Sequence, residues 1–196
     1  MSLLPLSTQE ILAPRNEVST SELLLRGGYP AVWMNDLHGR QILLSNYYTT
    51  YIERDVRSLI NVKDLQAFHT FIRLAAGRIG QEFNASALSV EVGVSLPTVK
   101  NWLSVLAASY VVYLLHPYHA NIGKRLTKTP KLYFYDTGLA AFLLGINSIE
   151  QLDVHPLRGS LMENLVVNDI VKHGCNQGRE ESLFSTATNR SVKLMC

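Results

Sequence analysis

Apolar side chains recur at helical spacing in two stretches of the first half of the chain. One stretch runs from Asn46 to Ile60 and the other from Asp64 to Arg78. Apolar residues three and four positions apart lie on one face of an α-helix. The pattern therefore predicts two amphipathic helices that direct their apolar faces at a core.

Residues 8–26 have a similar helical character but contain Pro14 in their middle. Because proline lacks the backbone donor that a helix interior needs, we expect a break there. The stretch leads into Gly27, Gly28 and Pro30, where glycine permits positive φ and proline fixes φ. The pattern predicts an interrupted helical segment followed by a turn.

The middle of the chain has the pattern of a helix-turn-helix unit. Residues 84–93 predict a short helix ended by Gly93, and Ser95 followed by Pro97 is typical of the start of the next helix. That second helix spans 96–109 and has apolar side chains on one face. A short helix, a Gly-Val-Ser turn and a second helix make up this unit.

Two β-rich runs, 110–115 and 131–135, follow the second helix and are joined by a polar connection. A helix-turn-helix followed by a β-hairpin predicts a winged helix, in which the connection is the wing. Each cation of this connection can neutralise a phosphate of a nucleic acid; the alternatives are a solvated turn or a protein-docking unit. The cations, with no acid between them, are Lys124, Arg125, Lys128 and Lys131.

Base-reading side chains of helix-turn-helix proteins lie near the N-terminus of the second helix. Thr98, Lys100 and Asn101 occupy that place here. The helix has no arginine to bind guanine through two hydrogen bonds, so contact with phosphates is better supported than reading of sequence. DNA is therefore one candidate partner of this unit, beside a protein that docks on it.

The last part of the chain predicts two further helices and two short strands. Asp136 reads as the N-cap of a helix that Gly145 ends, rather than as a metal ligand. A helix over 159–173 follows. Weak alternation over 182–185 and 191–195 predicts two strands, so the fold class is mainly α with a small β wing and an α/β segment at the end.

Composition narrows the class of protein. Hydrophobic residues make up 47% of the 196 residues, enough for one sizeable core or two small ones. Lys and Arg exceed Asp and Glu by 18 to 16, which excludes a histone-like polycation. No apolar run is long enough to span a membrane, and no Cys/His cluster has zinc-ligand spacing. We expect a cytoplasmic protein without structural zinc.

Five strings of the chain resemble the C-terminal part of a large family of bacterial predicted AAA-type ATPases. The resemblance implies an ATPase core ahead of Met1, then a winged helix, then a domain similar to restriction-endonuclease folds. The strings are Leu25–Pro30, Tyr51–Val56, Asn121–Arg125, Leu132–Leu139 and His155–Asn164.

The resemblance also implies a division of the chain into four segments. Residues 1–44 correspond to a remnant of the ATPase lid and linker, and 45–79 to a helical connector. Residues 80–135 are the winged helix-turn-helix, and 136–196 a truncated endonuclease-like domain.

This sequence departs from that family at both catalytic centres. No Gly-rich phosphate loop is present, because Gly123-Lys124 lacks the upstream glycine and is followed by Arg125. Glu163 is retained, but Ser191 and Lys193 stand where the nuclease-like strand has carboxylates. We therefore expect neither autonomous ATPase nor nuclease activity, no catalytic residue and no bound metal. ATP and Mg²⁺ are expected only if a separate chain supplies the phosphate-binding half.

Three features that the resemblance implies have simpler interpretations. Gly28-Tyr29-Pro30 resembles a nucleotide-lid turn, yet a plain turn explains it better. Arg54 and Arg57 are candidates for an arginine finger, yet alternating charges on a helix are more often local ion pairs. Glu163 is a candidate residual metal ligand, yet an ion-paired or surface glutamate is favoured.

The sequence thus favours a non-catalytic DNA-binding or interaction module derived from a predicted ATPase. One alternative is an accessory subunit that supplies lid or finger residues to a separately encoded ATPase, and a homo-oligomer is a further expected partner class. The other alternative is a truncated product without activity.

Overall fold

Helices account for most of the described chain, together with two short pairs of antiparallel strands. The computed structural model describes residues 4–15, 17–51, 64–118, 129–178, 184–185 and 192–193. The predicted mainly α fold with a small β part is confirmed. In chain order the elements are α1 (Thr8–Leu12), α2 (Thr20–Arg26), α3 (Pro30–Trp33), α4 (Leu37–Tyr47), α6 (Leu65–Ala76), α7 (Ala85–Val92), α8 (Leu96–Ala108), β1 (Val112–Leu115), β2 (Lys131–Phe134), α10 (Thr137–Leu143), α11 (Ile149–Asp153), α12 (Arg158–Asn176), β3 (Phe184–Ser185) and β4 (Val192–Lys193).

Short polar side chains begin the helices where the sequence predicts. Asp64, Asn84 and Ser95 cap α6, α7 and α8 by accepting backbone N–H groups, and Asp136 caps α10 in the same way. Gly93 ends α7 with φ of 77°, in the left-handed region that glycine adopts without steric cost. These four helices therefore form from signals within their own segments.

The N-terminal region agrees with the sequence at Pro14 and differs from it after Pro30. The break is confirmed, because α1 ends at Leu12 and α2 begins at Thr20. The helix predicted from Asn46 begins instead at Leu37 as α4, and a π-helical turn follows it over 48–51. Glycine and a buried arginine inside α4 weaken its amphipathic pattern, and residues 52–60 lie outside the described part of the chain. The helices α3 and α11 were also not predicted.

Helix α8 packs on α6 through an aromatic cluster. Trp102 of α8 lies edge-on to Phe68, with ring centroids 5.3 Å apart, and at the same distance from Phe71. All three side chains are buried in the main core. Such aromatic pairs stabilise beyond their buried area by about 0.5–1.5 kcal/mol each. The cluster fixes the rotation of α8 about its own axis.

Strand β2 lies between two partners. On one side β1 pairs with it in antiparallel register, Val112 opposite Phe134. On the other side the segment before α7 pairs with it: Gly80 N–H donates to the Leu132 carbonyl at 2.8 Å, and Leu132 N–H donates to Gln81 at 3.0 Å. The predicted hairpin is therefore present, and a third chain segment extends its small sheet.

The hairpin begins two residues later than predicted. Tyr110 adopts φ of 54°, and its N–H donates to the Ala107 carbonyl, while Val111 N–H donates to Leu106. These two residues end α8 with a left-handed cap before the strand begins. Tyrosine and valine favour strands by propensity, but the helix end determines their conformation here.

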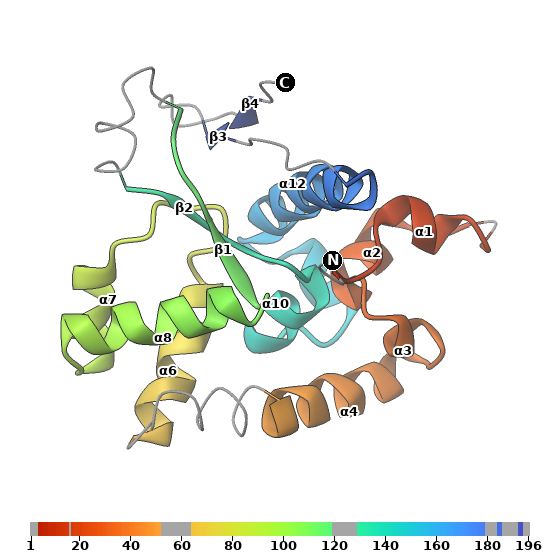
Figure 1. The fold of residues 1–196 in the computed structure, drawn as a ribbon. Coiled ribbons are helices and arrows are strands. Elements are labelled where there is room, and N and C mark those ends of the chain that lie inside the picture. Colours follow the sequence, from red (N-terminus) through yellow and green to blue (C-terminus); the bar gives the residue numbers. More distant parts are fainter. Residues whose placement is uncertain are drawn as a thin grey trace.

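One hydrophobic core joins all four predicted segments. Buried side chains from Ile11 in α1 to Leu165 in α12 form a single cluster, in which α10 contacts α2, α6 and α12. Figure 1 shows α6, α7 and α8 on one side of the molecule, α1, α2 and α12 on the other, and α10 between them. Residues from the predicted lid remnant and from the predicted endonuclease-like segment thus share one core with α7 and α8.

The two strands predicted near the C-terminus are confirmed as a short antiparallel pair. Phe184 of β3 lies opposite Lys193 of β4, and Ser185 lies opposite Val192. Within the described residues, no helix has both the length and the apolar character that crossing a membrane requires.

Candidate nucleic-acid interface

The face of α8 directed away from the core carries the predicted base-reading side chains. Val99, Trp102, Leu103 and Leu106 are buried, so the opposite face of the helix points outward. Lys100 and Asn101 are exposed, and neither side chain bonds to any residue that the structure describes. Both remain available to a partner.

Thr98 is less available than these two neighbours. Its hydroxyl lies 2.7 Å from the hydroxyl of Ser95, and its N–H donates to the same Ser95 oxygen at 3.2 Å. The side chain is half-buried and takes part in the N-cap of α8. Of the predicted reading residues, Thr98 therefore has a structural role as well.

Lys131 is engaged within the protein. Its ammonium group donates to the Glu163 carboxylate at 3.0 Å, and the Tyr133 hydroxyl donates to the same oxygen at 2.5 Å. Burial, followed by the hydrogen bond to Glu163 and the charge of Glu163, raises the pKa of Tyr133 far above its ordinary value. Glu163 is thus the ion-paired glutamate that the sequence favours over a metal ligand.

Five further predicted site residues belong to segments outside the described part of the chain. Lys124, Arg125 and Lys128 of the wing lie outside the described residues, as do Arg54 and Arg57. Within the described ranges, no group of three or more His, Cys, Asp or Glu side chains is arranged to hold a metal ion.

The Gly28-Tyr29-Pro30 turn packs against the protein core through Gly28 and Tyr29, while Pro30 is exposed. Gly27, which precedes the turn, is the C-cap of α2 and has a φ of 70°. A Cβ atom at this position would lie 2.4 Å from the Asp136 carboxylate. Tyr29 contacts the ring of Tyr47 at 4.9 Å, and Pro30 begins α3. These contacts account for the turn without a bound nucleotide.

Asp136 joins this turn to α10. Its buried carboxylate accepts N–H groups from Gly28 at 2.6 Å and from Leu139 at 2.7 Å. Burial raises the pKa of Asp136, while Lys172, the two N–H groups and Arg40 oppose the rise. The predicted N-cap is confirmed, and it also anchors a segment more than one hundred residues away.

Two buried cations near Asp136 were not predicted. Arg40 is fully buried and donates to the carbonyls of Leu25 at 2.6 Å and Gly138 at 3.2 Å; burial lowers its pKa to about 10. Lys172 donates to the Leu6 carbonyl at 2.9 Å, and burial lowers its pKa as well. Their carbonyl partners come from distant segments, so no local pattern could have identified them.

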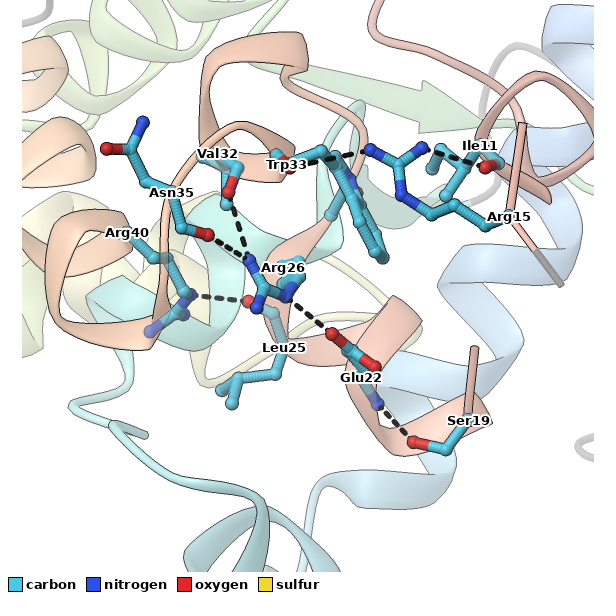
Figure 2. Close-up of polar contacts among 11 residues, drawn as sticks. Ile11, Arg15, Ser19, Glu22, Leu25, Arg26, Val32, Trp33, Asn35 and Arg40 are labelled. Atoms are coloured by element: carbon cyan, nitrogen blue, oxygen red, sulfur yellow. Dashed lines mark hydrogen bonds and ion pairs between the residues drawn. The ribbon is translucent and has the colours of Figure 1, made fainter. Parts of the chain in front are cut away.

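A second cationic cluster joins the ends of α1, α2 and α3. Figure 2 shows the Trp33 ring between Arg15 and Arg26, whose guanidinium carbons lie 4.8 and 5.3 Å from its centroid. Arg26 also pairs with Glu22 at 2.8 Å and donates to the carbonyls of Val32 and Asn35. The partners in these hydrogen bonds, ion pair and ring contacts all belong to the protein itself, so the cluster has a structural role.

The side chain of Asn164 attaches α12 to the sheet. Its amide accepts the N–H of Phe134 at 2.8 Å and donates to the carbonyl of the same residue at 2.9 Å, as a neighbouring strand would. Asn168 donates to that carbonyl too and accepts the Tyr113 hydroxyl at 2.9 Å. The sequence analysis assigned no role to Asn164 or Asn168, because the backbone groups that they bind belong to a strand about thirty residues away.

The chain is similar to one protein family and to several longer proteins. Residues 18–150 match a family described as a domain of unknown function, DUF8612. Uncharacterised proteins of Mycobacterium bovis and Mycobacterium tuberculosis are each 32% identical over 154 residues, 78% of this chain and 35% of theirs. An uncharacterised protein of Haemophilus influenzae is 26% identical over 188 residues, 89% of this chain and 45% of its own.

The chain therefore spans between a third and a half of the length of these curated relatives. Comparison with solved structures gives no match.

Proposed function

The chain belongs to the DUF8612 family, and we propose that its middle region is a winged helix that binds double-stranded DNA without catalysing a reaction. The order of elements supports this proposal. Helices α6, α7 and α8 are followed by the β1–β2 hairpin, and the segment before α7 forms isolated bridges with β2, Ile79 with Leu132 and Glu82 with Lys131. This is the arrangement in which a helix-turn-helix presents its second helix to a groove.

The observation that carries the proposal is the outward face of α8. Lys100 and Asn101 lie there, exposed and unbonded within the described chain, while Trp102 next to them is locked into the core. Figure 1 shows α7 and α8 at the edge of the molecule, away from α1 and α12. A DNA groove can therefore approach this face without any rearrangement of the described elements.

We propose that the wing adds contacts to phosphates. Lys124, Arg125 and Lys128 lie between β1 and β2 in the sequence, with no acid among them. Lys131 is left out of this set of phosphate contacts, because its ion pair with Glu163 at 3.0 Å already neutralises its charge. Three wing cations, rather than four, are thus proposed to face the DNA backbone.

Fluorescence anisotropy with a labelled duplex of about 30 base pairs tests the proposal. The chain should bind at about 50 mM salt, and the affinity should fall steeply as salt rises. Lys100→Ala should weaken binding and lower the salt slope by about one. Arg158→Ala removes an equal charge at the start of α12 and should leave the affinity and the salt slope unchanged. No binding at low salt, or equal effects of the two variants, would contradict the proposal.

A role as accessory subunit of a separate ATPase is the second candidate. It is supported by the greater length of the curated relatives, more than half of which lies outside the match. The internal contacts of Tyr29 with Tyr47, and of Gly28 with Asp136, favour the DNA-binding role over this one. A stable complex with the purified ATPase, formed equally well by Lys100→Ala, would support the accessory role.

A further inference from the structure

One amide group lies at the centre of the uncovered face of α8. Successive residues of a helix are turned by about 100° about its axis. The line along α8 that lies opposite its buried side chains therefore marks the centre of the exposed face; these buried side chains are Val99, Trp102, Leu103 and Leu106. Asn101 lies on that line, together with exposed Pro97, Ser104 and Ala108. Lys100 lies about 100° to one side, at the margin of the face.

The chemistry of Asn101 matches one base of the major groove. Its side chain carries one acceptor and an NH₂ donor, and it bonds to no described residue. Adenine presents an acceptor, N7, next to a donor, N6–H₂, whereas guanine presents two acceptors. An amide can complete two hydrogen bonds with adenine and only one with guanine.

The surroundings of Asn101 do not favour guanine. A guanine edge is best read by arginine, and α8 contains none. Its single cation, Lys100, is placed at the margin, where a groove-bound helix meets the phosphates rather than the bases. The exposed ring of Pro97, one turn earlier on the same line, offers an apolar contact for a thymine methyl group.

We propose that Asn101 is the specificity-determining residue of the interface and reads an adenine in the major groove. The preferred site then contains an A·T pair at the position opposite Asn101. This inference rests on the proposed DNA binding, and it adds a preference among sequences to what the wing supplies as sequence-independent affinity.

Selection from a library of duplexes with about 14 random base pairs tests the inference. The wild-type chain should enrich one position in A·T, and anisotropy should show that changing this pair to G·C weakens binding about tenfold. In Asn101→Ala the same change should have no effect on the affinity. Ser104→Ala, on the same line of α8, should retain the preference.

Replacing the selected adenine by 7-deazaadenine removes only the N7 acceptor. This replacement should weaken the wild-type complex severalfold and leave the Asn101→Ala complex unchanged. If the chain binds DNA but enriches no A·T position, or if Asn101→Ala keeps the preference, the inference is wrong and DNA binding stands. If the chain binds no duplex at low salt, the proposed function itself is wrong, and the inference fails with it.

Discussion

The carboxylate of Asp136 accepts the backbone N–H of Gly28 at 2.6 Å, across 108 positions of the chain. This contact holds the turn after α2 against the start of α10, where Arg40 and Lys172 are also buried. Asp136→Asn would place an NH₂ or a weaker acceptor against Gly28 and leave the two cations without their buried anion. We expect the free energy of unfolding to fall by about 3 kcal/mol, measured by urea unfolding.

Asp153→Asn is the matched control for this change. Asp153 is also an aspartate that accepts a hydrogen bond from a distant residue, Ser21, and another from Arg158 nearby in the sequence, but it is solvent-exposed. Exposed ion pairs contribute little to stability, so its unfolding midpoint should stay close to that of the wild type. Equal midpoints for both variants would show that Asp136 does not anchor the turn.

Signals within one segment were sufficient to predict much of this fold. The N-cap side chains of Asn84, Ser95 and Asp136 each accept the backbone N–H of the residue three positions further along their own helix. Gly93 ends α7 through its own backbone conformation. Such short-range interactions depend on neighbouring residues alone, so the sequence pattern is enough to place α7, α8 and α10.

Features that depend on distant partners were not predictable in the same way. No sequence pattern singled out Arg40, and it is buried because carbonyls from three other segments accept its N–H groups. Lys131 reads as a wing cation, yet Glu163 lies beside it because Asn164 attaches α12 to β2. Both outcomes depend on packing that no single segment determines.

The acid dependence of stability should include a contribution from Glu10. The hydroxyl and the backbone N–H of Ser7 donate to its carboxylate at 2.7 and 2.8 Å and hold the pKa of Glu10 below its ordinary value of 4.5. A lowered folded-state pKa stabilises the protein above about pH 4.5, and this contribution is lost as the pH falls through the folded value.

Glu10→Gln should therefore flatten the dependence of the unfolding midpoint on pH below about 4.5, and Ser7→Ala should do the same while removing about 1 kcal/mol through loss of the N-cap. Thermal unfolding measured from pH 3 to 7 checks this. Glu17→Gln removes an exposed carboxylate elsewhere and should keep the wild-type profile. A wild-type profile in Glu10→Gln would exclude a role for the capping box.

We expect the purified chain to bind no ATP. The sequence has no phosphate loop, and the turn that resembles a nucleotide lid is filled by the chain's own contacts, Tyr29 on Tyr47 and Gly28 on Asp136. Isothermal titration with ATP and Mg²⁺ should give no heat of binding. A dissociation constant in the low micromolar range would contradict the expectation and favour the accessory role.

The wing and Lys131 should respond differently to removal of charge. Lys124, Arg125 and Lys128 have no acid near them in the sequence, whereas Lys131 donates to Glu163 at 3.0 Å. Each cation that neutralises a phosphate contributes about 0.9 to the slope of the logarithm of affinity against the logarithm of salt concentration. The triple alanine variant of the wing should therefore lower this slope by about 2.7, because three such contacts are lost.

Lys131→Ala should change the slope by much less than one, since its charge is already paired within the protein. Glu163→Gln is the complementary variant. It removes the ion pair of Lys131, so Lys131 can contact a phosphate and the slope should become steeper by up to about one. Circular dichroism of each variant confirms that the fold is retained. If the triple variant keeps the wild-type slope, the wing does not contact phosphates; if Lys131→Ala lowers the slope as much as a wing cation does, the ion pair opens when DNA binds.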